Sequence, residues 1–281
     1  MMISRVKYYS YEEVFMSLGV SFSIITATWN CSSTLSECLR SVAFQDYRHI
    51  QHLVIDGAST DGTIEVIKDH IYLIDKFKSE PDLGIYDALN KGLEMATGDV
   101  VGFMHADDLF ASRTVISEIA RFFDDPSVCA VYGDLQYVHA QDTSRVIRHW
   151  KSSQFTQGDL LRGWMPAHPT LYVRRDWYRR IGCFNISYRI SADYLSVLKL
   201  FGTPDFKSVY HPEVLVKMRT GGTSNKSLKA ILRKSKEDWR ALRSCNFSAQ
   251  DSMRAIAWKN LSKISQFAWF PIGSQYALNR D

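Results

Sequence analysis

Gly-Asp-Val-Val-Gly-Phe-Met-His-Ala-Asp-Asp-Leu-Phe, residues 98–110, is an apolar run that ends in two adjacent carboxylates. The part at 100–104 has the length and the β-branched content of a buried strand. In an open α/β sheet, ligands bind at the carboxyl ends of the strands. Asp107 and Asp108 would lie at such an end, where paired acids offer oxygen ligands to Mg²⁺ or Mn²⁺. The alternative is that they only cap the next helix, because Asp is a favoured N-cap residue.

Strand and helix patterns alternate around this run. Runs typical of strands lie at 21–28, 52–55, 99–104 and 128–138. Apolar residues at helical spacing lie at 33–44, 64–74, 84–96 and 190–201. Strands that alternate with helices in this way predict βαβ units and parallel pairing. We therefore expect an α/β fold, with one Rossmann-like domain whose mainly parallel central sheet is flanked by helices.

The composition limits the class of protein. Of the 281 residues, 46% are hydrophobic and 23% are charged, as in soluble globular proteins rather than disordered ones. The sequence has no apolar run near the roughly 18 residues that a membrane span needs, and its first 20 residues lack the core of a signal peptide. Five scattered cysteines without a C-x-x-C pair favour a reducing compartment. We expect a cytoplasmic protein.

Common nucleotide and nucleophile motifs are missing from the sequence. We find no G-x-G-x-x-G dinucleotide motif, no P-loop and no G-x-S-x-G elbow. Carboxylates instead follow predicted strands: Asp56 could accept hydrogen bonds from a base or ribose, and Asp107 with Asp108 could hold a metal on phosphates. Asp193 would then be free to deprotonate a hydroxyl nucleophile. This division of labour describes sugar transfer from a nucleotide diphosphate.

Several stretches together resemble family-2 glycosyltransferases of the GT-A fold. The matching stretches are 23–30 (SIITATWN), 54–63 (VIDGASTDGT), 84–92 (GIYDALNKG), 96–99 (ATGD), 105–108 (HADD) and 168–194. Each motif is weak by itself, but their order and spacing are specific. The resemblance covers about 21–224. It implies a GT-A domain at 21–224, with a nucleotide-sugar half at 21–110 and an acceptor half at 111–224. An extension at 1–20 and a basic amphipathic helical tail at 225–281 would flank this domain.

The resemblance also implies roles for single residues. It assigns Thr28, Trp29 and Asp56 to the nucleotide, usually uridine in this family. Asp107 falls on the motif for diphosphate and metal together with Asp108, and Asp193 falls on the catalytic base. The chain departs from the family pattern at His105 and Gly57, where many relatives carry an acid.

His168 has two open interpretations. It either lines the acceptor pocket or is a hydrogen-bonded structural histidine.

The implied reaction is the transfer of one sugar from a nucleotide-diphosphate sugar, expected to be a UDP-sugar, with inversion. A divalent metal, Mn²⁺ or Mg²⁺, is the implied cofactor. The acceptor would be a hydroxyl of a glycan or a lipid-linked sugar in the synthesis of a cell-surface polysaccharide or glycolipid. Two alternatives stay open. One is a catalytically silent sugar-nucleotide-binding or scaffold subunit, and the other is a nucleotidyltransferase, although the basic glycine-rich loop of that class is missing.

The basic charge of the chain is concentrated in its tail. The net charge is +4, and residues 225–281 contain eleven Lys and Arg against four Asp and Glu, so the tail carries +7 and the body −3. Apolar residues in the tail recur at helical spacing and lead to an aromatic run at 267–271. The tail either packs on the domain or docks on an anionic membrane on its cytoplasmic face. Nucleic acid is a poor partner for an acidic body without a binding motif.

Overall fold

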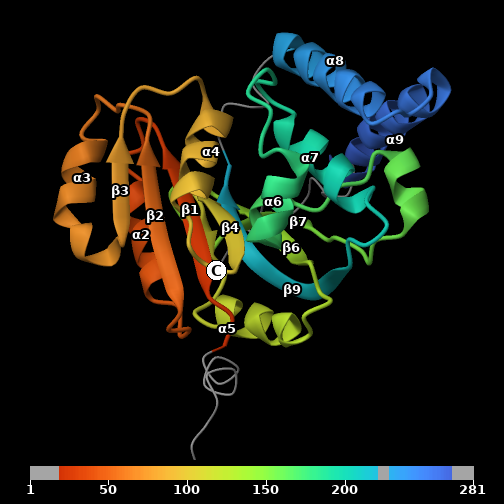
Figure 1. The fold of residues 1–281 in the computed structure, drawn as a ribbon. Coiled ribbons are helices and arrows are strands. Elements are labelled where there is room, and N and C mark those ends of the chain that lie inside the picture. Colours follow the sequence, from red (N-terminus) through yellow and green to blue (C-terminus); the bar gives the residue numbers. More distant parts are fainter. Residues whose placement is uncertain (1–18, 221–227, 268–281) are drawn as a thin grey trace, which may run out of the picture.

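The computed structural model describes residues 19–220 and 228–267. Its first half is the expected alternation of strands and helices (Figure 1). In chain order the elements of this half are β1 (Phe22–Thr28), α2 (Leu35–Ala43), β2 (Ile50–Asp56), α3 (Thr63–Asp69), the 3₁₀ turn η1 (Ile71–Leu73), β3 (Lys76–Ser79), α4 (Ile85–Met95) and β4 (Val100–His105). The strands β3, β2, β1 and β4 are neighbours in that order and pair in parallel. The prediction of parallel βαβ units is therefore confirmed for this half.

The second half of the sheet is mixed. Its elements are β5 (Leu109–Phe110), α5 (Val115–Ala120), η2 (Arg121–Asp124), β6 (Ala130–Val138), β7 (Val146–Trp150), η3 (Gln157–Arg162), η4 (His168–Thr170), β8 (Tyr172–Arg174), α6 (Arg175–Ile181), α7 (Ala192–Phe201) and β9 (Ser208–Arg219). β8 is antiparallel to both β4 and β6, whereas β9 lies parallel to β6 and antiparallel to β5. The sheet is thus continuously parallel from β3 to β4, the short antiparallel strand β8 joins β4 to β6, and β6 and β9 form a further parallel pair.

Helices cover both faces of the sheet, because alternate strand residues point to opposite sides. Ile25 and Phe103 belong to one apolar cluster with residues of α4 and α7. Ile24 and Met104, their neighbours in sequence, belong to a second cluster with residues of α2 and α5. This double cover explains the near-continuous apolar runs of the central strands, since both faces of each strand are buried.

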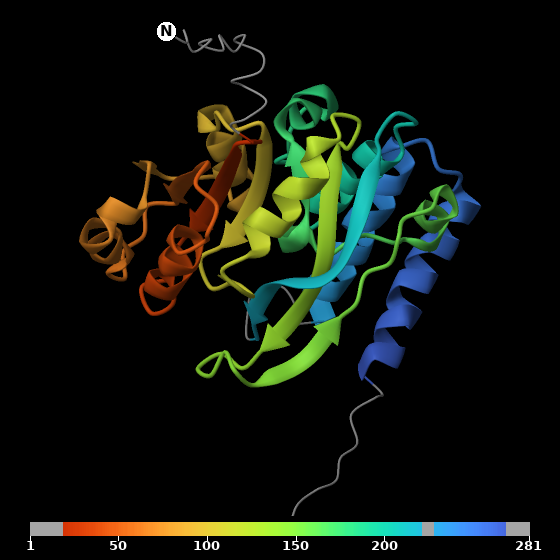
Figure 2. The same ribbon diagram turned by 90° about the horizontal axis from the view of Figure 1, so that it is seen from below.

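The tail forms two helices, α8 (Leu228–Ser244) and α9 (Ala249–Phe267), that lie against α7 and η3 in the second half of the domain (Figures 1 and 2). Ala241, Leu242 and Ala255 are fully buried and belong to the same apolar cluster as α7. A Cβ on Gly163, at the end of η3, would meet the carbonyl oxygen of Ala255 at 2.5 Å, so α9 packs tightly against that turn. Of the two interpretations of the tail, packing on the domain holds for these helices. The extension at 1–18 and the aromatic residues 268–271 lie outside the described residues.

Candidate active site at the ends of the parallel strands

The register of the parallel strands brings the predicted residues to one edge. Thr28 at the end of β1 is paired with Asp56 at the end of β2, and Ala27 is paired with His105 at the end of β4. Trp29 follows directly and is 64% exposed, which is unusual for a residue of its size. The edge therefore has an exposed indole on one side and the His105–Asp108 turn on the other.

Asp107 and Asp108 form the acidic corner of this edge. Asp108 is completely buried, and neither of its carboxylate oxygens has a hydrogen-bond partner in the part of the chain that the structure describes. Burial, reinforced by the nearby carboxylate of Asp107, raises the pKa of Asp108 well above its usual range. The guanidinium of Arg219, at the end of β9, lies beside this corner and donates to the backbone oxygen of Asp107 at 2.7 Å. It also donates to the Glu37 carboxylate, which ties the end of β9 to α2.

This corner fits a divalent metal that is shared with a diphosphate. An unpartnered buried carboxylate is costly unless it gains a proton or a cation. In residues 19–220 and 228–267, no group of three His, Cys, Asp or Glu side chains lies close enough to hold an ion by itself. Mg²⁺ is commonly held by one or two carboxylates together with substrate phosphates. Asp107 and Asp108 match that donor set and would leave the remaining positions to the diphosphate.

Asp193 lies in the first turn of α7 and is held from two sides. Its carboxylate accepts a hydrogen bond from the backbone N–H of Tyr194 at 2.8 Å. The hydroxyl of Tyr86, from the first turn of α4, lies 3.1 Å from the same oxygen and donates to the carbonyl of Ile190 at 2.6 Å. Burial, together with the charge of Asp193, raises the pKa of Tyr86 far above its ordinary value, so this phenol stays protonated. Helices from both halves of the domain thus meet at one carboxylate.

Two histidines lie near Asp193: His168 is buried, and His105, at the end of β4, is half-buried. His168 in η4 stacks on Phe103 with ring centroids 5.4 Å apart, and its ring lies 6.4 Å from that of His105. Burial lowers the pKa of His168 to about 4. Burial also lowers the pKa of His105, against the opposing effect of the carboxylates of Asp107 and Asp193. Both histidines are therefore neutral at pH 7.

Each histidine also has a buried ring nitrogen without a hydrogen-bond partner among the described residues: Nδ1 of His105 and Nε2 of His168. The structural interpretation of His168 as a hydrogen-bonded histidine is not supported at Nε2, whereas contact with the acceptor stays a prediction.

Asp56 holds the loop at the nucleotide end together. Its carboxylate accepts hydrogen bonds from the backbone N–H of Ser59 at 3.0 Å, from the Ser59 hydroxyl, and from the Ser79 hydroxyl at 2.7 Å. Asp56 is fully buried, so this network rather than open space surrounds it. Asn30 joins the same loop, because its backbone N–H donates to Ser59 and its side-chain oxygen accepts from the N–H of Thr60. Contact between Asp56 and the nucleotide stays a prediction.

A carboxylate that the sequence patterns did not single out lies beside Gly57. A Cβ on Gly57 would meet Oδ2 of Asp82 at 2.5 Å and Cδ1 of Trp29 at 3.4 Å. Asp82 belongs to the loop between β3 and α4, and its other oxygen accepts the N–H of Gly84 at 2.8 Å. The acid that many relatives carry at position 57 is thus missing from that position, but a carboxylate occupies the neighbouring space.

The described geometry therefore brings Tyr86, His105, His168 and Asp193 together, with Asp107 next to them, while Thr28, Trp29 and Asp56 mark the other end of the same edge. The role of Tyr86 was not predicted, although it lies inside the motif at 84–92. The supporting roles of Arg219 and Asp82 were also missed, because each depends on contacts between distant parts of the chain.

Comparison with known proteins decides the family. The model of "Glycosyl transferase family 2" matches residues 23–182, more than half of the chain. The chain belongs to this family. It is a glycosyltransferase, as the motif order predicted.

Characterised and uncharacterised relatives agree with this assignment. The glycosyltransferase is 30% identical over 210 residues to the "PGL/p-HBAD biosynthesis glycosyltransferase" of Mycobacterium bovis, which covers 73% of this chain and 79% of the relative. It is 36% identical over 187 residues to an uncharacterized glycosyltransferase of Mycobacterium tuberculosis, covering 66% of this chain and 70% of the relative.

Solved structures confirm the GT-A fold. The S. aureus TarS structure (residues 1–349), determined with UDP-GlcNAc, superposes with a TM-score of 0.66 at 17% identity. That match covers 80% of this chain and 65% of the TarS chain, so this chain spans less than two thirds of that neighbour. The mannosyltransferase PcManGT from Pyrobaculum calidifontis, solved with GDP-Man and Mn²⁺, gives a TM-score of 0.60 at 19% identity over 86% of this chain and 69% of the other.

Proposed function

We propose that this glycosyltransferase moves one sugar from a nucleotide-diphosphate sugar, a UDP-sugar, to a hydroxyl group of a glycan or lipid-linked acceptor, with inversion at the anomeric carbon. The observation that carries the proposal is the meeting of Asp193, Tyr86 and the acidic corner at the ends of the parallel strands. The names of the neighbours support the donor class, because one was solved with UDP-GlcNAc and another with GDP-Man. The mycobacterial relatives are named "PGL/p-HBAD biosynthesis glycosyltransferase", which supports a role in a biosynthetic pathway.

In this proposal Asp193 removes the proton of the acceptor hydroxyl as the hydroxyl oxygen attacks the sugar. A carboxylate can do this if it lies within hydrogen-bond reach of the hydroxyl. Tyr86 keeps one oxygen of Asp193 in place and leaves the other for the acceptor. The neutral imidazoles of His105 and His168 border the reacting groups and can hydrogen-bond sugar hydroxyls through their unpartnered nitrogens.

Next to this group, Asp107 and Asp108 would hold the diphosphate through a divalent metal. When bound, Mn²⁺ or Mg²⁺ stabilises the negative charge of the departing diphosphate. The exposed face of Trp29 is placed to stack on the base, and Asp56 keeps the loop beneath it in shape through Ser59 and Ser79. The acidic corner that would hold the leaving group thus lies next to the proton acceptor, and the nucleotide would extend from there toward Thr28 and Trp29.

Two titrations and two variants test this proposal. UDP should bind the purified protein in the presence of Mn²⁺ and much more weakly in EDTA, as measured by calorimetry. Asp193→Asn should lower the transfer rate at least about 100-fold and leave the affinity for UDP within twofold. Asp107→Ala should remove the effect of Mn²⁺ on binding. If UDP, GDP and dTDP all fail to bind, the scaffold alternative becomes the better description. Full activity of Asp193→Asn would remove that residue from the base role.

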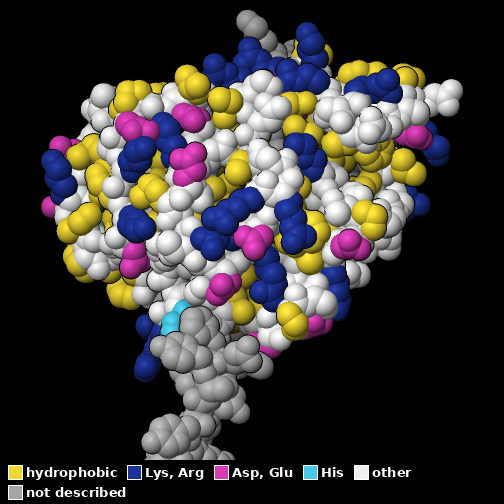
Figure 3. All heavy atoms as spheres, in the orientation of Figure 1, with side chains coloured by type: hydrophobic (Ala, Val, Ile, Leu, Met, Phe, Trp, Pro, Cys, Tyr) yellow, Lys and Arg dark blue, Asp and Glu magenta, His cyan; other side chains and the backbone are white. Residues whose placement is uncertain are grey.

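We also propose that α8 and α9 bring the enzyme to the cytoplasmic face of an anionic membrane, where a lipid-linked acceptor would be found. Large apolar side chains on these helices are 57–72% exposed: Leu232, Met253, Trp258 and Leu261. Figure 3 shows Lys and Arg side chains gathered along the upper rim, where Figure 1 places α8. Exposed apolar groups with basic neighbours favour anionic lipid surfaces. None of the described helices is long and apolar enough to cross a bilayer.

Vesicle binding by variants of exposed side chains tests this location, because such substitutions leave the packed core intact. Trp258→Ser with Leu261→Ser should reduce binding to vesicles that contain phosphatidylserine and leave the activity on a soluble acceptor unchanged. The matched control is Ile71→Ser with Tyr72→Ser, which also replaces two exposed apolar side chains by serine but lies in the first half of the domain. Equal vesicle binding by the two double variants would refute the membrane surface.

A further inference from the structure

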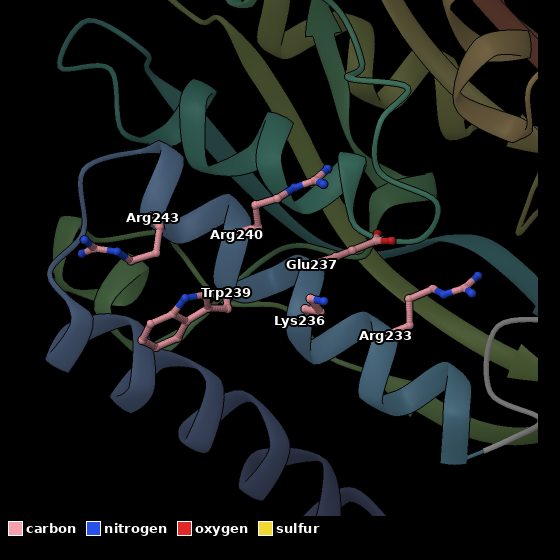
Figure 4. A pocket seen from close by; sticks show the side chains of 6 residues that line it. All are labelled: Arg233, Lys236, Glu237, Trp239, Arg240 and Arg243. Carbon is pink, nitrogen blue, oxygen red and sulfur yellow. The ribbon is translucent and has the colours of Figure 1, made fainter.

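Glu237 on α8 binds the segment that leads into α7. Its carboxylate accepts hydrogen bonds from three successive backbone N–H groups: Arg189 at 3.1 Å, Ile190 at 2.8 Å and Ser191 at 3.0 Å. Figure 4 shows Glu237 pointing from α8 toward the α7 side, between Arg233 and Arg240. These residues line a hollow of about 420 Å³ together with Lys236, Trp239 and Arg243. A side chain of the tail thus reaches the loop before the proposed base.

Of these three N–H groups, that of Ser191 belongs to the N-cap residue of α7, and those of Arg189 and Ile190 lie in the loop just before the helix. The first N–H groups of a helix have no acceptor within the helix, and the N-terminus favours negative charge. Ser191 is the N-cap residue of α7, but its own side chain makes no capping hydrogen bond. Glu237, from another helix, therefore supplies an acceptor for the N–H of Ser191. Hydrogen bonds to a charged carboxylate are stronger than those between neutral groups.

The capped segment is short and carries Asp193. Asp193 is the second residue of α7, two positions after Ser191. Tyr86 donates to the carbonyl of Ile190, whose N–H is held by Glu237. A shift of this segment would move both the backbone and the carboxylate of Asp193 relative to Tyr86.

A second side chain of α8 also contacts this segment, and α8 is itself held to α9 by an ion pair. Arg240 donates to the backbone oxygen and the hydroxyl of Ser187, both at 2.9 Å, and lies over the ring of Tyr188 at 3.7 Å. Asp238, next to Glu237, forms a buried ion pair with Lys259 of α9 at 2.9 Å. The segment 187–191 is thus clamped to a helix that cannot move without breaking a buried ion pair.

We infer that Glu237 is a positioning residue for sugar transfer: it fixes the start of α7 and so holds Asp193 at the acceptor hydroxyl. This inference rests on the base role of Asp193 in the proposed function. It adds that the tail, beyond the part matched by the family model, helps to build the active site.

The test compares Glu237→Gln and Glu237→Ala with Glu94→Gln, which makes the same chemical change at an exposed position of α4. We expect kcat to fall about 10-fold or more in Glu237→Ala and less in Glu237→Gln, because the amide oxygen still accepts hydrogen bonds. The affinity for UDP, measured by calorimetry, should stay within twofold. Amide hydrogen exchange at 189–191 should become faster in both Glu237 variants and stay unchanged in Glu94→Gln.

The outcomes separate this inference from the proposed function. An unchanged kcat together with faster exchange at 189–191 would refute the positioning role while leaving Asp193 as the base. Unchanged exchange would refute the contact itself. A loss of UDP affinity equal to the loss of kcat would indicate a general structural role and also overturn the inference. If Asp193→Asn is fully active, the base role fails, and the exchange experiment still reports on the clamp. Glu237→Gln keeps the size of the side chain, so it serves if Glu237→Ala does not fold.

Discussion

Replacing Lys259 with Met should test how firmly α8 and α9 are built into the catalytic domain. Nζ of Lys259 lies 2.9 Å from the Asp238 carboxylate, and their side chains are only 8% and 5% exposed. The same Nζ lies 3.3 Å from the centre of the Tyr194 ring in α7. Burial lowers the pKa of Lys259 to about 7, against the opposing charge of Asp238. The ion pair therefore joins three helices in a place from which water is nearly excluded.

Lys259→Met should lower the free energy of unfolding, because it leaves the Asp238 carboxylate buried without its nearest cation. Lys259→Met removes one charge and leaves the Asp238 carboxylate buried, a change that typically costs about 3–5 kcal/mol. Domains of this kind are stable by about 5–15 kcal/mol, so roughly a fifth or more of the stability would be lost. Lys234 also faces Asp238, but at 3.8 Å and 25% exposed. Lys234→Met should therefore cost no more than about 1 kcal/mol.

Urea unfolding at pH 6, where Lys259 is charged, measures both variants. The double variant Lys259→Met with Asp238→Leu should recover most of the loss, because an apolar pair of similar volume avoids desolvating two charges. Equal free energies of unfolding for Lys259→Met and Lys234→Met would refute the reasoning. So would a double variant that is no more stable than Lys259→Met.

Three further substitutions test the donor end, the base and the sheet. Trp29→Ala should weaken UDP binding by about 1–3 kcal/mol in calorimetry, because base stacking on an aromatic side chain has that magnitude, and an affinity within twofold of the parent would contradict the stacking. Tyr86→Phe removes the hydroxyl 3.1 Å from Asp193, so kcat should fall about 10-fold with UDP affinity unchanged, and an unaltered kcat would leave Tyr86 without a role in positioning. Gly102→Ala should destabilise the domain by about 1–3 kcal/mol in urea, because its Cβ would meet Cε1 of Tyr172 at 2.4 Å; a smaller effect would mean that β8 can move away from β4.

The first half of the fold could be predicted because its elements are local. The helix expected at 84–96 is α4 (Ile85–Met95), and the strand expected at 99–104 is β4 (Val100–His105). Their apolar periodicity and flanking glycines lie within a single stretch of chain. β3 (Lys76–Ser79) was missed because it is a four-residue edge strand with little apolar pattern. β9 (Ser208–Arg219) was missed because its pairing with β6 joins segments about 78 residues apart, and no local pattern predicts such a pairing.

The residues of the candidate site also fall into those that a local motif predicts and those that depend on contacts between distant segments. Asp107, Asp108 and Asp193 could be selected because each lies within a short motif with a chemical meaning. The support of Asp193 by Tyr86 spans 107 positions, and the capping of Ser191 by Glu237 spans 46, so neither was predicted. The structure also changes the view of Asp56, whose carboxylate organises its loop through Ser59 and Ser79. For Asp56 to contact the nucleotide, as predicted, a hydrogen bond to the nucleotide would have to replace one of those to Ser59 or Ser79.

The packing of the tail indicates that α8 and α9 belong to the catalytic domain, although the change in charge at 225 set them apart from it. The jump in basic charge at 225 set the tail apart from the domain and left two interpretations open, packing on the domain or docking on an anionic membrane. Ala241 and Leu242 of α8 are as fully buried as the residues of α7, and Glu237 on the same helix holds the segment before Asp193. A helix that only anchored the enzyme would gain nothing from a carboxylate aimed at the start of α7. We therefore expect removal of α8 and α9 to abolish transfer even with a soluble acceptor, whereas loss of a membrane anchor alone would spare it.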